Sequence, residues 1–187
     1  AGLLIHGKQG HLAYPNLAIN PIHRAMPPLN ALVAEPWDQG NDLFDPTSLQ
    51  ISTIRAGQGV TNVIPGSVEV LFNLRFSTEV TADEIRERCE AILDQGGLTY
   101  DIKWSVSGEP FLTEPGALLN AVTGSIEATT GRVPEVSTGG GTSDGRFIAP
   151  SGAQVVEVGH VNQTIHQINE RVKLADIPRL SKIYEGI

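Results

Sequence analysis

The 187 residues suffice for one medium domain or two small ones, and 40% hydrophobic with 18% charged residues is ordinary globular usage. A formal net charge of -8 argues against broad attraction to nucleic acid or to an anionic membrane surface. The single cysteine, Cys89, excludes an internal disulfide, and no run reaches the roughly 18 apolar residues that a membrane span needs. We therefore expect a folded cytoplasmic protein with neither nucleic acid nor membrane as a partner.

The first expected elements are a strand over residues 3–6 and a helix that begins at Asn20 and Pro21. Asparagine is a favourable helix cap, and proline suits the first helical position. Pro27 and Pro28 lie inside this helix, so we expect a kink or two short helices. The apolar stripe of the helix comprises Ile22, Ala25, Met26, Leu29, Leu32 and Val33.

The next elements are strands over residues 49–54 and 67–76, a helix that begins at a Thr81–Glu84 capping box, and a strand over residues 100–106. Cys89 shares the apolar face of that helix, which predicts a core position. The order strand, helix, strand, strand, helix, strand is the ferredoxin-like arrangement over an antiparallel sheet. In the strand over residues 67–76, alternation places Val68, Val70, Phe72, Leu74 and Phe76 on one face and Glu69, Asn73 and Arg75 on the other.

From Glu114 the pattern becomes α/β. We expect a helix over residues 118–128, a short strand that ends at Thr138, a glycine-rich turn, an apolar strand over residues 153–158 and a final helix from about Ala175. These two strands have little to pair with here, which suggests that they complete a sheet whose other strands are missing. The chain also enters its first strand almost at once and has no initiator methionine, so we expect it to be cut from something longer.

The glycine-rich segment, residues 137–146, is the sharpest local motif. Its three successive glycines allow the backbone to approach a ligand, Thr142 and Ser143 add hydroxyls, and the guanidinium of Arg146 suits a carboxylate. The spacing matches neither a P-loop nor a dinucleotide-binding motif. The segment is therefore either an anion-binding loop or a tight turn between a strand and a helix.

His166 follows the apolar strand, in a loop where functional groups are common. Its imidazole could bind zinc, although a lone histidine is more often a hydrogen-bonded structural residue. His160 and Glu157 are nearby, but neither an H-E-x-x-H motif nor a cysteine pair is present. Any metal site therefore needs ligands from elsewhere.

Three further polar residues have both a functional and an ordinary interpretation. His11 could donate to a developing oxyanion or be an exposed loop histidine. Asn62 could line a site or simply form the turn that ends in Pro65 and Gly66. Arg75 could contact substrate or form a solvated salt bridge with its strand neighbours.

Taken together, the motifs resemble one family. The runs GKQGHLAYPNLAINPIHRA, GVTNVIPGSVEVLFNLRFST, TGGGTSDGRFIAPSGAQVVEVG and NQTIHQINERV are similar, in order and spacing, to those of the succinyl-diaminopimelate desuccinylases, within the aminoacylase and carboxypeptidase group of two-zinc hydrolases. The resemblance implies an α+β fold in which residues 1–112 form a ferredoxin-like dimerisation (lid) domain. It further implies that residues 113–187 are the C-terminal segment of an α/β catalytic domain whose N-terminal half is absent.

The resemblance also assigns roles to individual residues. It implies that His166 is a zinc ligand and that His11 stabilises the oxyanion in the site of the partner subunit. The residues that it places around the substrate are Tyr14, Asn62, Arg75, Gly141, Thr142, Arg146 and Asn162.

The activity implied by the resemblance is hydrolysis of N-succinyl-LL-2,6-diaminopimelate to succinate and LL-diaminopimelate, in lysine and diaminopimelate biosynthesis. Two zinc ions, with cobalt as a substitute, would serve a homodimer that forms through residues 1–112 and binds a small carboxylate-bearing substrate. With one metal-binding histidine, the chain by itself is expected to be inactive. The alternatives are a related aminoacylase or deacetylase, or a stand-alone homodimerisation or binding module. The predicted strand faces carry Glu69, Asn73, Asp101 and Lys103, which does not favour a nucleic-acid-binding module.

Overall fold

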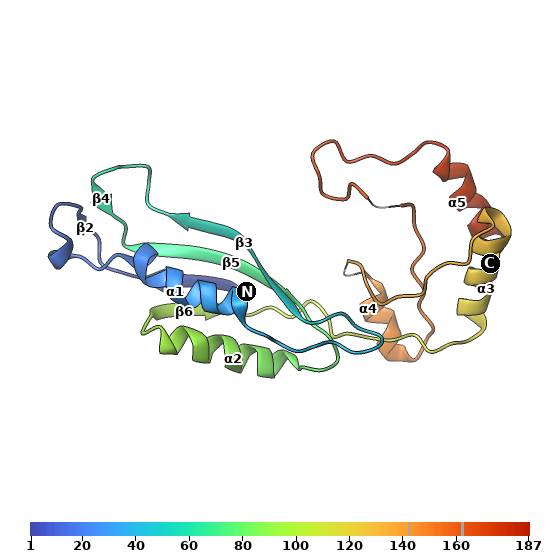
Figure 1. Ribbon diagram of the computed structural model, residues 1–187, viewed down its shortest axis with the longest axis horizontal. Helices are drawn as coiled ribbons and strands as arrows, with labels where there is room; N and C mark the ends of the chain where they lie inside the picture. Colours follow the sequence, from blue (N-terminus) through green and yellow to red (C-terminus); the bar gives the residue numbers. More distant parts are fainter. Residues whose placement is uncertain (142, 162) are drawn as a thin grey trace. The chain divides into compact units, whose positions relative to one another are not determined.

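The computed structural model describes residues 1–141, 143–161 and 163–187. The chain divides into two compact units, Ala1–Ser107 and Gly108–Ile187 (Figure 1).

The first unit contains a four-stranded sheet and two helices (Figure 1). The sheet order is β3-β5-β1-β6, and every neighbouring pair is antiparallel. The prediction of a ferredoxin-like α+β arrangement is confirmed, because the elements follow the predicted order. Their bounds are β1 Gly2–His6, α1 Pro21–Ala34, β3 Ser48–Ala56, β5 Ser67–Arg75, α2 Ala82–Gln95 and β6 Thr99–Lys103.

Strand alternation builds the core of this unit. Leu3 of β1 lies opposite Val70 of β5 and Ile102 of β6, so apolar side chains meet on one face of the sheet. Both helices pack their apolar residues against that face, and Cys89 is fully buried there, as predicted. On β5 the predicted inward side chains Val68, Val70 and Phe72 are buried, while Leu74 and Phe76 pack half-buried against the core.

Helix α1 departs from the expectation of two short helices. It runs unbroken from Pro21 to Ala34, and the side chain of Asn20 caps it by accepting from Ile22 N at 3.0 Å. Pro28 is buried, so its packing helps to offset the backbone hydrogen bonds that the internal prolines remove. The predicted stripe is only partly inward, because Met26 and Val33 are exposed.

Short helices make up the regular structure of the second unit. They are α3 (Ala117–Thr130), α4 (Gly145–Ile148), the 3-10 turn η2 (Ala149–Ser151) and α5 (Asp176–Glu185). The predicted helices over residues 118–128 and from about Ala175 are confirmed by α3 and α5. The side chain of Ser125 in α3 donates to the carbonyl of Ile183 in α5 at 2.6 Å, which joins the two helices.

The two strands predicted in this unit do not form, and that prediction is wrong for this chain. Neither the residues that end at Thr138 nor residues 153–158 are in a strand. The Thr113 hydroxyl donates to Val155 O at 2.5 Å and accepts from Val155 N at 3.2 Å, so a side chain replaces the missing strand partner at that residue. A strand needs a neighbour for its backbone groups, and the described part of this unit supplies none.

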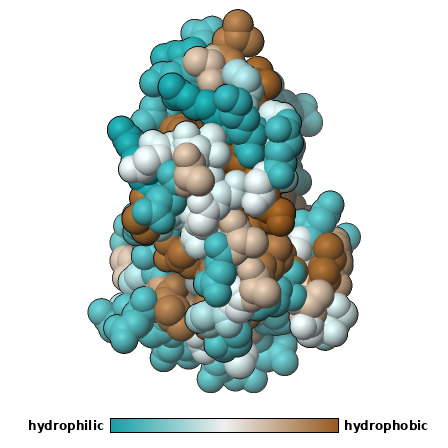
Figure 2. All heavy atoms as spheres, turned by 90° about the vertical axis from the view of Figure 1, so that its right-hand side faces the viewer, coloured by the Kyte–Doolittle hydropathy of each residue, from teal (hydrophilic) through white to brown (hydrophobic). Residues whose placement is uncertain are grey.

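The second unit also buries little apolar surface. Val122 and Ile183 are its only buried hydrophobic side chains among the described residues. Figure 2 shows hydrophobic residues at the surface among hydrophilic ones on the face that it presents. The large hydrophobic residues of this unit that are more than half exposed are Val133, Val136, Phe147, Ile148, Val161, Ile168, Leu174, Ile177 and Tyr184.

Candidate functional site

One group of predicted site residues meets at one end of the first unit, in a segment that we call the tip, residues 10–17 and 62–64. It contains the short strands β2 (Gly10–His11) and β4 (Val63–Ile64) and the 3-10 turn η1 (Pro15–Leu17), and it is visible in Figure 1 at the β2 and β4 labels. His11 pairs with Val63, and Leu12 N donates to the carbonyl of Asn62 at 2.9 Å. The structure thus brings Asn62 to His11 and Tyr14, although Asn62 lies about fifty positions further along the sequence.

Close backbone crossings hold the tip on the unit. Gly7 N donates to Gly66 O at 2.8 Å, and Lys8 exchanges two backbone hydrogen bonds with Ile19. A Cβ atom on Gly7 would lie 2.4 Å from Ile19 O, so only glycine fits there. Glycine before His11 therefore allows two backbone segments to pass close to each other. This close approach fixes the position of the segment that carries the histidine.

The His11 ring has two neighbours within the tip. Its Nδ1 accepts a hydrogen bond from the backbone amide of Ala13 at 3.1 Å. The Tyr14 ring lies 5.6 Å from it, centroid to centroid, at a tilt of 50°. The large apolar side chains of the tip and its flanking residues are exposed, namely Leu12, Tyr14, Leu17, Ile19 and Val60.

Arg75 does not join this group. Arg75 is the last residue of β5, whereas the tip lies near Gly66 and Ser67 at the other end of that strand. Nine residues of strand span roughly 25 to 30 Å, which separates Arg75 from the tip. Glu69, a strand neighbour of Arg75, pairs with Arg55 on β3 at 3.6 Å.

In the glycine-rich segment, Gly139, Gly140 and Gly141 are exposed, and Gly140 has a φ of 127° that favours glycine. The crowded position is Gly145, where a Cβ would lie 2.7 Å from the side chain of Val155. The segment thus has exposed glycines at residues 139–141 and a tightly packed glycine at the first residue of α4.

Arg146 is the second residue of α4 and is half-buried. Its Nη1 donates to Ser143 O at 2.7 Å, and its guanidinium carbon lies 4.3 Å from the Phe147 ring centroid. Its Nε is buried and has no hydrogen-bond partner among the described residues. An anion that accepts from this nitrogen would remove the cost of leaving it unpaired.

His166 lies exposed in a loop that Thr164 closes. The Thr164 hydroxyl donates to Arg171 O at 2.9 Å and accepts from Arg171 N at 3.0 Å. His166 itself has a φ of 59°, uncommon outside glycine, and its backbone amide donates to Glu170 Oε2 at 3.2 Å. The histidine is therefore held in a defined backbone turn while its side chain stays exposed.

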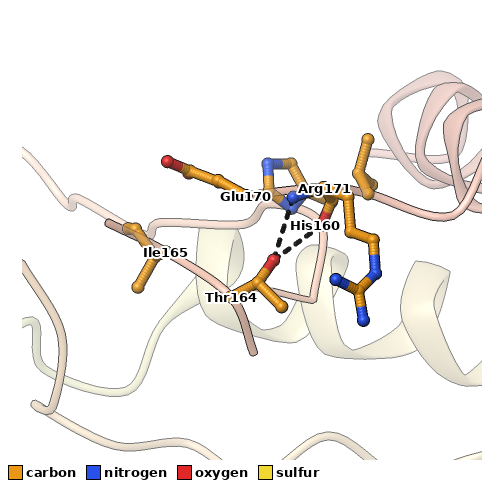
Figure 3. Close-up of a pocket in the computed structure, with 6 residues that line it drawn as sticks. His160, Thr164, Ile165, Glu170 and Arg171 are labelled. Carbon is orange, nitrogen blue, oxygen red and sulfur yellow. Dashed lines mark hydrogen bonds between the residues drawn. The ribbon is translucent and has the colours of Figure 1, made fainter. Parts of the chain in front are cut away.

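The same loop borders an open pocket of about 200 Å³ (Figure 3). His160 contributes a ring whose Nδ1 donates to the Val161 carbonyl at 3.0 Å. The residues that line the pocket are His160, Thr164, Ile165, Glu170, Arg171 and Val172.

A metal centre is not assembled by the described residues alone. Within residues 1–141, 143–161 and 163–187, no three His, Cys, Asp or Glu side chains lie together as a ligand set. Thr142 and Asn162, two of the predicted substrate residues, lie outside the described residues. In the same described part, no helix has the length and apolar character of a membrane span.

Sequence reasoning overlooked the residues that hold these sites in place. Ala13 acts through its backbone amide and Thr164 through its hydroxyl. Neither residue type indicates a functional role in the sequence. Gln154 caps α3 from outside, because its Oε1 accepts from Leu118 N at 3.0 Å and its Nε2 donates to Glu114 O at 3.1 Å. The only clue was that Gly116, at the cap position, has no side chain with which to cap the helix.

Comparison with known proteins identifies close sequence relatives. The peptidase dimerisation domain family matches residues 2–101. Succinyl-diaminopimelate desuccinylase of Alkalilimnicola ehrlichii is 59% identical over 185 residues, which is 99% of this chain and 49% of that protein. The enzyme of the same name from Ectopseudomonas mendocina is 58% identical over 97% of this chain and 48% of its own length. This chain thus spans about half the length of the curated relatives that it matches.

Solved structures show the same fold at much lower identity. A tripeptidase from Staphylococcus aureus matches with a TM-score of 0.73 and 19% identity, over 98% of this chain and 48% of that one. Aminopeptidase PepT from Bacillus cereus matches with a TM-score of 0.68 and 21% identity, over 98% and 48%. At such identities the likeness establishes the fold alone.

Proposed function

The chain belongs to the succinyl-diaminopimelate desuccinylases and carries their peptidase dimerisation domain, and from this premise we propose that it is the C-terminal part of such an enzyme. The proposed reaction is hydrolysis of N-succinyl-LL-2,6-diaminopimelate to succinate and LL-diaminopimelate, in the cytoplasm. The observation that carries the proposal is the 58–59% identity to proteins of that name over nearly the whole chain.

The architecture of the two units supports the proposal of a larger enzyme. The second unit exposes many apolar side chains and leaves residues 153–158 without a strand partner. Both features are expected of a segment that packs against further α/β structure of the same catalytic domain. We propose that residues 113–187 complete that domain and that residues 1–112 form the dimer.

The tip supports a role in the partner's site. It carries exposed apolar side chains as well as His11 and Asn62, an arrangement suited to being covered on assembly. His11 would donate to the oxyanion that develops on the scissile carbonyl. The unpaired Nε of Arg146, and Arg75, would bind carboxylates of the substrate.

His166 would be one ligand of a zinc centre whose other ligands come from outside this chain. Zinc, when bound, supplies an acidified water and stabilises negative charge. His166 is exposed on a fixed turn, which suits an imidazole that completes a site with another segment. Because no ligand set forms within the described residues, we propose that the chain alone is inactive.

The test compares the full-length protein with the 187-residue chain, each with zinc and succinyl-diaminopimelate. The full-length dimer should release succinate, and the chain alone should not. His11→Ala should lower kcat of the full-length enzyme by about 10²- to 10³-fold, as expected for loss of an oxyanion donor. His23→Ala, a change at an exposed histidine of α1, is the matched control and should leave kcat unaltered.

Metal content and substrate choice separate the alternatives. His166→Ala should lower bound zinc and reduce activity more than about 100-fold. Preference for an N-acetyl amino acid over the succinyl substrate would favour an aminoacylase or deacetylase. A full-length protein that dimerises but hydrolyses neither substrate would favour the alternative of a homodimerisation or binding module.

A further inference from the structure

The tautomer of His11 can be inferred from one hydrogen bond. The backbone amide of Ala13 lies 3.1 Å from His11 Nδ1, and an amide nitrogen can only donate. Nδ1 must then be the unprotonated nitrogen of the ring. In the neutral imidazole the single proton consequently lies on Nε2.

The backbone around this contact is fixed on both sides. Tyr14 N donates to His11 O at 2.9 Å and closes the turn that contains Ala13, while Leu12 N is bound to Asn62 O at 2.9 Å. Gly10 has no room for a side chain, since its Cβ would lie 2.7 Å from the Cβ of Ala18. The Tyr14 ring, 5.6 Å from the His11 ring, restricts the ring further. The amide of Ala13 is thus held where it meets Nδ1 and not Nε2.

We propose that the backbone amide of Ala13 is a positioning group that keeps His11 in the Nε2–H form. The inference rests on the proposed function, in which His11 donates to an oxyanion. A donor that spends time as the Nδ1–H tautomer has no proton on Nε2 to offer. The Ala13 amide selects the donating form without touching substrate, and a doubly protonated ring cannot keep this bond because Nδ1 then has no lone pair.

The first test is the tautomer itself, measured in the 187-residue chain. Long-range proton–nitrogen NMR correlations on the 15N-labelled chain at about pH 8.5 distinguish protonated from unprotonated ring nitrogens. His11 should show an unprotonated Nδ1 and a protonated Nε2, whereas the exposed His23 should show an average of both forms. An averaged His11, or one protonated on Nδ1, overturns the inference.

The second test removes the amide donor and keeps the side chain. Lactic acid in place of Ala13 converts its amide to an ester that cannot donate. The same replacement at Ala18, whose amide donates to Pro15 O at 3.2 Å in the same segment, is the matched control. Only the ester at residue 13 should shift His11 toward the averaged form of His23. An unchanged His11 contradicts the positioning role.

Kinetics of the full-length enzyme separate this inference from the proposed function. The ester at residue 13 should lower kcat about fivefold and change KM less than about twofold, as expected for loss of one neutral hydrogen bond that acts through His11. Unchanged kcat in the ester, with a large loss in His11→Ala, overturns the positioning role alone. Unchanged kcat in His11→Ala overturns the proposed role of His11, while the NMR result still decides the tautomer.

Discussion

At the residue scale, Cys89 illustrates a property that follows directly from burial. The residue lies on the inner face of α2 with Ile85 and Leu93, and none of its surface is exposed. Burial raises the pKa of the Cys89 thiol to about 12, because the thiolate would lose its hydration. Its burial thus makes the Cys89 thiol poorly reactive.

Cys89 should therefore resist alkylation in the folded chain. At pH 8 a thiol with a pKa of about 12 has roughly a thousandfold less thiolate than a thiol at the ordinary value of 9.0. The rate with iodoacetamide should be correspondingly low in native buffer and should rise to that of a model thiol in urea. Equal rates under both conditions would contradict the burial.

Asp38 is a second residue with a specific electrostatic environment. Its Oδ1 accepts from Gly40 N at 2.7 Å and from Thr47 N at 3.1 Å. Burial alone would raise the pKa of this carboxyl, but hydrogen bonds from Thr47 and Gly40 outweigh burial, and the pKa is lowered. Through these hydrogen bonds the carboxylate stabilises the loop between α1 and β3.

Asp38→Ala should lower the free energy of unfolding by about 1 to 3 kcal/mol at neutral pH. Because the folded-state pKa lies below the unfolded value, the stabilisation is present above about pH 4 and is lost as pH falls through the folded pKa. Urea unfolding across pH should show the difference between variant and unaltered chain shrinking in acid. Asp42→Ala, in the same loop, is the control, and a pH-independent difference would refute the assignment.

At the element scale, helix ends differ in where their caps come from. Helix α2 is capped locally, since Thr81 Oγ1 accepts from Glu84 N at 3.2 Å and Thr81 N donates to Glu84 Oε2 at 2.7 Å. Helix α3 is capped by Gln154, which lies 36 residues beyond the amide that it accepts from. Only the first kind of cap is readable as a sequence motif.

Thr81→Ala should destabilise the first unit by about 1 kcal/mol, because it leaves the Glu84 amide without its cap. Thr81→Ser keeps the hydroxyl and should stay close to the unaltered chain. Chemical denaturation monitored at Trp37 and Trp104 would measure both variants. Equal losses in the two variants would point to the lost methyl group and not to the cap.

At the scale of the whole molecule, the two units differ in how complete their cores are. The first unit buries apolar residues from β1, β3, β5 and both helices in one cluster, and Tyr100 and Ile102 of β6 pack half-buried against it. The second buries few, and its residues 153–158 form no strand ladder. Local stability should therefore be high in the first and low in the second.

Amide hydrogen exchange should reveal this difference. Amides of β1 and β5 should be well protected, while those of Gln154, Val156 and Glu157 should exchange fast in the chain alone. In the full-length protein the latter should slow by roughly 100-fold or more, if residues 153–158 gain strand neighbours. Equal rates in both proteins would argue against the proposed completion of a sheet.

The sequence by itself determined the main sheet and the order of strands and helices in the first unit. Alternation in β5, the capping box of α2 and the core position of Cys89 all appear as predicted, because each depends on neighbours within a few residues. The internal prolines of α1 do not divide the helix into two, and the burial of Pro28 that helps to keep it continuous is a tertiary effect. Local patterns raised His11, Asn62, Arg75, Arg146 and His166 as candidates, and the resemblance added Tyr14 and Asn162 and assigned their roles. Neither gave an account of how these residues are held.

Only the tertiary structure decided how the tip and the second unit are built. The meeting of His11 with Asn62, and the Ala13 amide on the His11 ring, depend on backbone crossings that no local pattern encodes. The strand pattern of residues 153–158 is present in the sequence, but a strand exists only with a partner. Its hydrogen bonds must be made by another segment, and the described part of this chain provides two side chains, the Thr113 hydroxyl at Val155 and the Tyr184 hydroxyl at the carbonyl of Val158.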